Sequence, residues 1–296
     1  MSLRVPDSNL QDSALFYLGK NQQSLFALEQ QIASGKRVHS PVDDAVSYVR
    51  AKDLRDVLTQ VDQYKRNLNR SEDHVSVTES ALSTMEGVLQ RAKEIAISQA
   101  NATIDASQRA TMAVEMQDII DELVVLGNTQ LEGRYVFAGS KTGTAPYNAA
   151  GVYGGDALAR NVEIGDGVTT QVNTTGDEIF NPAGGTATFT ELIALRDALQ
   201  NNNVPNIQAA IDNLDPAIEQ VTKARMVNGF RLKRIDTQRD TLEDIGLQTR
   251  TILSDQEDID MASAISEMIQ QQTTLEATRA TLGRILSSRS LLDFMG

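Results

Sequence analysis

The stretch LRDVLTQVDQYKRNLNRSEDHVSVTESALSTMEGVLQRAKEIA, residues 54–96, decides the fold of this chain. Apolar residues recur along it at alternating steps of three and four, and only Ser71 and Thr78 interrupt them with polar side chains. This spacing is the stripe of a helix that packs lengthwise on other helices. A helix rises about 1.5 Å per residue, so the stretch predicts a rod. The stripe consists of Leu54, Val57, Val61, Tyr64, Leu68, Ser71, Val75, Thr78, Leu82, Met85, Leu89, Ala92 and Ala96.

Helical patterns continue on both sides of this stretch. One helix is predicted over about residues 8–33, and Ser40-Pro41-Val42-Asp43 is predicted to begin the long helix, with Ser40 as N-cap and Pro41 in its first turn. A third helix is predicted from Ala106, and a turn at 101–105 would lay it antiparallel to the second. The pattern returns at 190–200, from Pro205 onward, and in a last run almost to the final residue.

The middle of the chain differs in composition. From Gly139 to Gly185 it is rich in Gly, Thr, Asn and Ala, and short β-like runs at 162–164 and 170–172 lie between turn signals. We predict a mainly α fold, a long antiparallel helical rod with a small β-rich lobe in the middle of the chain. The expected parts are paired terminal helices (1–45 and 255–296), a long-helix domain (46–138 and 190–254) and the lobe (139–189).

The two ends carry one-sided apolar helices, which is unusual because order and hydrophobicity normally fade there. Ordering the backbone costs about 1–2 kcal/mol per residue, and burial of a Leu or Ile side chain returns about 1.5–3 kcal/mol. The net free energy of folding each terminal helix alone is therefore near zero. Either the ends pack on each other or neighbouring subunits cover them. The predicted subunit-interface residues are Leu10, Leu15, Leu18, Leu25 and Ile32 at one end and Ile265, Met268, Leu275, Leu282, Ile285 and Leu286 at the other.

Composition excludes several classes of partner and chemistry. Lys and Arg number 27 against 40 Asp and Glu, a formal net charge of −13, which argues against nucleic acid or an anionic membrane as partner. Cysteine is absent, so disulfides and thiol chemistry are excluded. No apolar run reaches the length of a membrane span, and no secretory signal is visible.

Several short motifs are more specific than the helical pattern. IASGKRV at 32–38, followed by SPVDDA at 40–45, resembles the N-terminal signature shared by the flagellin and hook-associated protein family. GRYVFAG at 133–139 with Pro146-Tyr147, RMVNGFRLKR at 225–234 and SLLDF at 290–294 resemble hook-associated protein 3. The similarity covers nearly the whole chain, and the C-terminus lacks the N-Q-x-x-Q element expected of a flagellin.

The resemblance implies a structural subunit of the bacterial flagellum at the hook–filament junction. It implies hook-associated protein 1, flagellin and like subunits in a ring as partners, and an export chaperone and the type III apparatus as the route out of the cell without a cleaved leader. The terminal helices would pair in the inner tube and the lobe would face outward. A short flagellin forming the filament itself is the alternative, and a cytosolic coiled-coil scaffold is a more distant one.

No catalytic, cofactor or metal site is predicted. His39 and His74, the two histidines, lie in polar surroundings that favour a solvated or capping role. The acidic run at 255–260 lacks the spacing of a calcium loop and is expected to be a solvated bend or helix start. The basic residues Arg225, Arg231, Lys233, Arg234 and Arg239 predict a solvated face with ion pairs or, alternatively, a contact with an acidic neighbour. An enzyme is the least favoured class, because no nucleophile–base set emerges.

Overall fold

The computed structural model describes the backbone of residues 7–182, 185 and 187–293 and the side chains of those between 12 and 284. The chain forms two compact units, one from Met1–Thr59 with Gly246–Gly296 and one from Gln60–Ile245. Two long helices, α2 (Ala45–Gln99) and α6 (Val204–Glu257), contribute residues to both units. Helices dominate and the sheets are two-stranded, so the predicted mainly α fold is confirmed.

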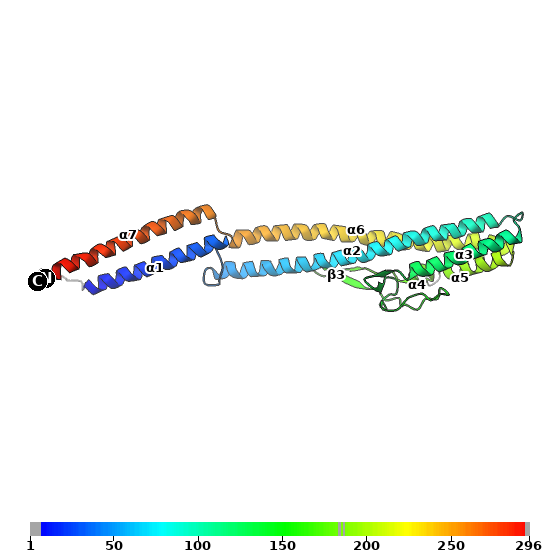
Figure 1. Ribbon diagram of the computed structural model, residues 1–296, viewed down its shortest axis with the longest axis horizontal. Coiled ribbons are helices and arrows are strands. Elements are labelled where there is room, and N and C mark those ends of the chain that lie inside the picture. Colours follow the sequence, from blue (N-terminus) through cyan, green and yellow to red (C-terminus); the bar gives the residue numbers. More distant parts are fainter. Residues whose placement is uncertain (1–6, 183–184, 186, 294–296) are drawn as a thin grey trace. The chain divides into compact units, whose positions relative to one another are not determined.

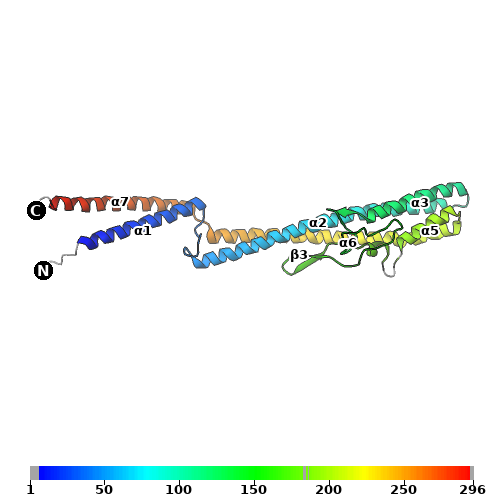
Figure 2. The ribbon, with the colours of Figure 1, turned by 60° about the horizontal axis from the view of Figure 1, so that its bottom comes forward.

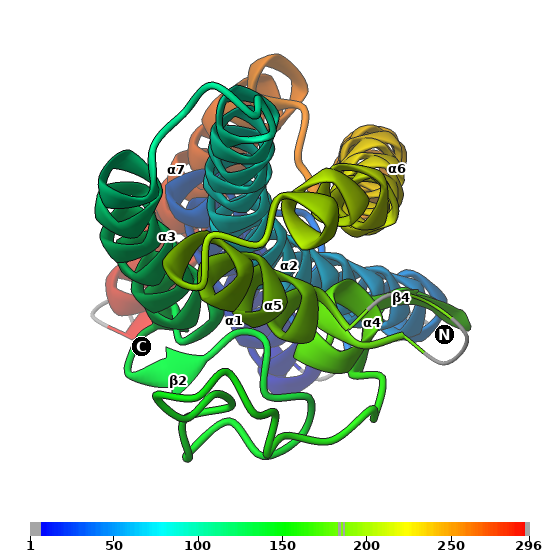
Figure 3. The ribbon, with the colours of Figure 1, turned by 90° about the vertical axis from the view of Figure 1, so that its right-hand side faces the viewer.

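The unit of residues 60–245 is a helical bundle. Helices α3 (Ala106–Gly127) and α5 (Thr188–Gln200) gather around α2 and α6 at one end of it (Figure 3). Their apolar faces meet in one core cluster, and α2 and α6 run antiparallel beside it (Figure 1). The core includes Leu82, Leu89, Met116, Leu123, Leu192, Leu195 and Leu214, each of which is fully buried.

The predicted stripe of α2 is buried along most of its length, and its part from Leu82 to Ala96 lies in this core. Leu68 and Val75 are fully buried, whereas Val57 is 39% exposed. The two polar residues of the stripe are buried as well, because their hydroxyl groups find partners within the helix. Ser71 Oγ donates to the carbonyl of residue 67 at 2.7 Å, and Thr78 Oγ1 donates to that of His74 at 2.7 Å.

A β-hairpin covers the middle of α2 and α6. Strand β3 (Asn161–Gly165) pairs antiparallel with β4 (Val168–Gln171), with a bulge between Glu163 and Gly165. Ile164 of the hairpin is buried against Leu68 of α2 and Ile235 of α6 in a second core cluster. The hairpin confirms the predicted strands.

The rest of the lobe is irregular and is held by aromatic packing. Strands β1 (Gln130–Leu131) and β2 (Arg134–Tyr135) come just before it, and it contains the short helix α4 (Gly176–Phe180), which a capping box of Thr175 and Glu178 begins. The rings of Tyr147, Phe180 and Phe189 pack on one another with centroids 5.1–5.6 Å apart. These aromatic contacts join the lobe to the bundle core.

The predicted start of the long helix is wrong by several residues. Helix α2 begins at Ala45, where Asp44 accepts hydrogen bonds from the Ser47 N–H (3.1 Å) and hydroxyl (2.6 Å). The Ser40–Asp43 segment forms a separate turn closed by a hydrogen bond from the Asp43 N–H to the Ser40 carbonyl at 3.1 Å. Two neighbouring aspartates thus have different roles. Asp43 belongs to the turn, and Asp44 caps the start of α2.

His74 is another correction, because it is 7% exposed and therefore neither solvated nor a cap. Its neighbours in sequence are polar, but the β3–β4 hairpin and the long helices enclose it.

The basic residues of α6 are partly internal as well. Arg225 pairs with Glu79 at 2.9 Å and with Glu86, and Arg239 pairs with Glu72, so both link α6 to α2.

Candidate assembly interface

The terminal helices α1 (Asp7–Ser34) and α7 (Met261–Asp293) lie side by side (Figures 1 and 2). Their shared seam is narrow. Leu28 of α1 and Ala264 and Leu275 of α7 are buried at 9%, 4% and 7% exposure. The expectation that the two terminal helices pack on each other therefore holds in part, because α1 and α7 cover each other along this seam.

The structure divides the predicted interface residues into three groups. Leu275 is buried in the seam, whereas Leu15 is 56% exposed and Ile265 is 41% exposed. The half-buried residues, which border the seam, are Leu18, Leu25, Ile32, Met268 and Leu282. The side chains of Leu10, Ile285 and Leu286 lie outside the described residues. Whether these residues touch neighbouring subunits remains a prediction.

Sequence reasoning missed the aromatic part of this surface. Phe16 is 69% exposed, Tyr17 59% and Phe26 68%. The rings of Phe16 and Tyr17 pack edge to face with their centroids 5.8 Å apart. Leu15 and Phe26 are eleven residues apart, about three helical turns, so they lie on the same side of α1. The eleven-residue spacing of Leu15 and Phe26 is visible in the sequence and is the signal that could have revealed this surface.

A groove of 570 Å³ runs along the seam on the α7 side. Its walls are small residues such as Ala14, Ala277 and Thr278. Thr274 and Thr278 donate their hydroxyl groups to carbonyls one turn earlier in α7, both at 2.8 Å. With their hydroxyls paired in this way, the threonines contribute methyl groups to the groove, which is mostly apolar.

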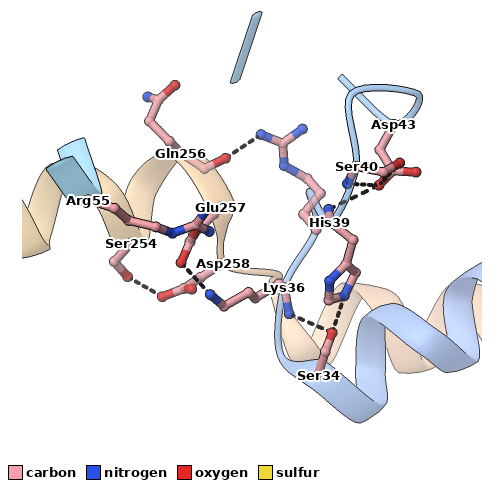
Figure 4. Close-up of polar contacts among 11 residues, drawn as sticks. Ser34, Lys36, His39, Ser40, Asp43, Arg55, Ser254, Gln256, Glu257 and Asp258 are labelled. Atoms are coloured by element: carbon pink, nitrogen blue, oxygen red, sulfur yellow. Dashed lines mark hydrogen bonds and ion pairs between the residues drawn. The ribbon is translucent and has the colours of Figure 1, made fainter. Parts of the chain in front are cut away.

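Where α1 ends, the chain crosses to α2 beside the link from α6 to α7 (Figure 4). Gly35 leaves the helix with φ +72°, and its carbonyl accepts from the Ile259 N–H at 3.0 Å. The Arg37 N–H donates to the Glu257 carbonyl at 2.6 Å, and Lys36 forms an antiparallel bridge with Asp258. The two crossing segments therefore pair through their backbones.

The side chain of Glu257 lies at the centre of this crossing and is only 6% exposed. Its carboxylate pairs with Lys36 Nζ at 2.7 Å and with the Arg55 guanidinium of α2 (Figure 4). We call these three side chains the Glu257 anchor. The acidic run was predicted to be solvated, which is wrong for Glu257, because the anchor residues come from three separate parts of the chain. Asp260 does stand at a helix start, since it accepts from the N–H of Ala262 at 2.9 Å just before α7, whereas Asp255 lies in the last turn of α6.

Two aspartates fix the turn that leads into α2. Asp43 accepts from the N–H groups of His39 (3.0 Å) and Ser40 (2.8 Å), and these hydrogen bonds hold the pKa of Asp43 below its usual value. The Ser47 hydroxyl lowers the pKa of Asp44 in the same way. Both carboxylates are therefore ionised acceptors that shape the backbone.

The remaining polar groups of this region make local contacts. Exposed His39 contacts the hydroxyl of Ser34, as expected for a solvated or capping residue. Within the part of the chain that the structure describes, no three His, Cys, Asp or Glu side chains come together as metal ligands. None of the helices there is both long enough and apolar enough to cross a membrane. The geometry suits contacts between helices.

Comparisons with known proteins all point to flagellar proteins. Residues 7–142 match the family described as the bacterial flagellin N-terminal helical region. The chain is 30% identical to flagellar hook-associated protein 3 of Escherichia coli strain K12, over 84% of this chain and 86% of that protein. It is 29% identical to the protein of the same name from Salmonella typhimurium, over 94% and 96%. A solved structure of a putative flagellar hook-associated protein from Vibrio parahaemolyticus is 25% identical, with a TM-score of 0.68 over 73% of this chain and all of that one.

Proposed function

Because this chain belongs to the flagellar hook-associated protein 3 family, we propose that it is a structural subunit of the hook–filament junction, held there by its paired terminal helices. It is a flagellar protein and acts by assembly, not by catalysis. The observation that carries the proposal is the incomplete cover of α1 and α7. They bury one seam between them and expose Leu15, Phe16 and Phe26 to water.

Exposed aromatic and aliphatic side chains gathered on one helix pair mark a surface for association. On α7, Ile265 and Ile269 are 41% and 55% exposed, so both members of the pair carry uncovered apolar side chains. The groove lined by small residues beside them offers room for a neighbouring helix to approach closely. We propose that the occupant of this surface is the terminal helix pair of a second copy.

The proposal extends to specific partner proteins. Hook-associated protein 1 would contact the assembled layer on one side and flagellin on the other, with like subunits completing a ring. Export through the type III apparatus with a chaperone would bring the chain to the cell exterior. The apolar surfaces of α1 and α7 support a chaperone, because they would need cover before assembly.

The test is the variant Phe16→Ser/Phe26→Ser, expressed in a strain that lacks its own copy of this protein. We expect secretion of the variant and loss of filaments from the hook, because the exposed rings contribute to the contact between copies and not to the seam. The matched control is Phe230→Ser, which removes a ring that is 67% exposed on α6. Normal filaments with the double variant would overturn the proposal.

The match of residues 7–142 to a flagellin family favours a second candidate, a short flagellin that forms the filament itself. Purified full-length chain distinguishes the two. A junction subunit stays unpolymerised without its neighbours, whereas a flagellin seeded with filament fragments extends them. Electron microscopy of seeded samples reads out the difference.

A further inference from the structure

A cavity of 580 Å³ lies beside the middle of α2, away from the terminal helices. Three parts of the chain form its walls: α2, the β1–β2 hairpin, and the β3–β4 hairpin with the residues next to it. All lie within the unit of residues 60–245. The lining residues that matter for its chemistry are Arg70, His74, Glu132, Arg134 and Arg160.

The cavity concentrates positive charge in a chain whose net charge is −13. Arg70, Arg134 and Arg160 all line it, and within the described part of the chain no hydrogen bond or ion pair engages their guanidinium groups. Most other arginines of the unit do have partners, as Arg225 and Arg239 show. Among the described lining residues Glu132 alone carries a carboxylate, and it forms no ion pair with them.

Arg160 is the least exposed of the three arginines. Burial is the main cause that lowers the pKa of Arg160, and the nearby guanidinium of Arg134 is the second. Two like charges beside each other in a partly dry site repel, which favours an anion between them.

His74 adds a buried polar atom to the same wall. The side chain is 7% exposed, and its Nδ1 atom has no hydrogen-bond partner among the described residues. The ring also lines the cavity, so its signals would respond to the charge of an anion bound there. An imidazole nitrogen also complements the arginines, because it can accept a hydrogen bond from a protonated oxygen.

We propose that this cavity is a binding site for an oxyanion of the phosphate or carboxylate type, held by Arg70, Arg134 and Arg160 beside His74. Planar guanidinium groups match the oxygen pairs of both kinds of anion and bind them through charge-assisted hydrogen bonds. The site is independent of the assembly function proposed for α1 and α7, since it uses none of their residues.

The experiment is a titration of the full-length chain with inorganic phosphate at pH 7, with ionic strength held constant by sodium chloride. The chain has two histidines, so the ring Hε1 proton signals of His74 and His39 can be followed separately by NMR and assigned with His39→Gln. We expect a saturable shift of the His74 signal and none of His39. A parallel titration with sodium acetate identifies the source: saturation by acetate alone indicates a carboxylate ligand.

Two variants test the arginines. Arg160→Gln and the more exposed Arg134→Gln should each weaken binding by about tenfold or more, as loss of a charge-assisted hydrogen bond implies. Arg66→Gln is the matched control, since it removes a charge from α2 outside the cavity and should leave binding unchanged. Circular dichroism checks that each variant is folded. The proposal falls if neither anion gives a saturable His74 shift, or if binding survives both cavity variants.

Discussion

The Nζ atom of Lys36 lies 2.7 Å from Oε1 of Glu257, and this ion pair joins the end of α1 to the end of α6. Arg55 of α2 approaches the other carboxylate oxygen, so one buried side chain holds segments from both ends of the sequence. The backbone follows the same path, since the Arg37 N–H donates to the carbonyl of Glu257 at 2.6 Å. The Glu257 anchor is thus the polar counterpart of the apolar seam between α1 and α7.

Replacing Glu257 with Gln should loosen this crossing. The carboxamide keeps the size but loses the charge that pairs with Lys36 and Arg55, and we expect a cost of about 1–2 kcal/mol because both cations are half-exposed. The measurement is hydrogen exchange at the Arg37 amide, which should become faster. Glu29→Gln is the control, because Glu29 is an exposed residue of α1. Unchanged exchange at Arg37 would show that the backbone pairing does not depend on the anchor.

Acid should destabilise the unit of residues 60–245 through His74. Burial, with help from the Arg160 guanidinium, lowers the pKa of His74 from its ordinary value of 6.5 to about 4. Between these values the unfolded chain binds a proton that the folded chain does not, so stability is complete above pH 6.5 and falls as the pH drops toward 4. The loss should reach up to about 3 kcal/mol.

Urea unfolding at pH 7 and pH 4.5 measures this effect. His74→Gln should show a smaller difference between the two pH values than the parent chain, whereas His39→Gln should keep the full difference. A pH dependence that is the same in all three proteins would assign the acid sensitivity to other groups. Asp43, Asp44 and Asp156 contribute only at lower pH, since the pKa of each is held below its usual value.

Two glycine substitutions should have opposite effects. Gly139 has φ +69°, and a Cβ there would lie 2.2 Å from the carbonyl oxygen of Asp156, so Gly139→Ala should destabilise the lobe by about 1–3 kcal/mol. Gly87 lies inside α2, where a Cβ would meet nothing within 4 Å, so Gly87→Ala should stabilise the chain by up to about 1 kcal/mol. Thermal unfolding of the two variants gives the signs directly. A stable Gly139→Ala protein would mean that the lobe can shift to accept the methyl group.

Periodicity predicted the long elements well because their burial depends on neighbours three and four residues away. Leu68, Leu82 and Leu89 are fully buried where the stripe placed them, and the helix boundary at Ala106 is as expected. The same local logic found β3 and β4, whose turn signals flank them. Patterns within one segment were sufficient for these features.

Features that depend on distant segments were not predictable in this way. Glu257 lies in an acidic run, and its burial depends on Lys36 and Arg55, which are more than 200 residues earlier in the chain. His74 lies among polar neighbours, and its burial depends on a hairpin that begins at Asn161. The exposed rings of Phe16 and Phe26 were missed for another reason, since a helix pair with one seam leaves the other faces open whatever they carry.

Arg109 supplies the last prediction, because it is a charged side chain with 2% exposure at the end of the bundle. Its Nε donates to the carbonyl of Gln99 at 3.1 Å, and its terminal nitrogens donate to the carbonyl of Asn101 at 2.7 Å and to the side chain of Asn202. These acceptors lie at the end of α2 and in the α5–α6 turn. One guanidinium group therefore holds the end of α2 and that turn together through hydrogen bonds. The negative end of the α2 dipole also favours a cation there.

Arg109→Met should therefore cost about 2–4 kcal/mol, because it removes three hydrogen bonds and leaves buried carbonyls without a donor. Arg91→Met is the matched control, since the Arg91 side chain is 55% exposed and its ion pair with Glu115 should contribute less than about 1 kcal/mol. Urea unfolding followed by circular dichroism measures both. Asn202→Gly, which keeps the left-handed backbone of Asn202 (φ +54°) and removes its amide, completes a double-mutant cycle with Arg109→Met. Strictly additive losses in that cycle, or equal stability of the Arg109 and Arg91 variants, would show that the guanidinium does not join the two turns.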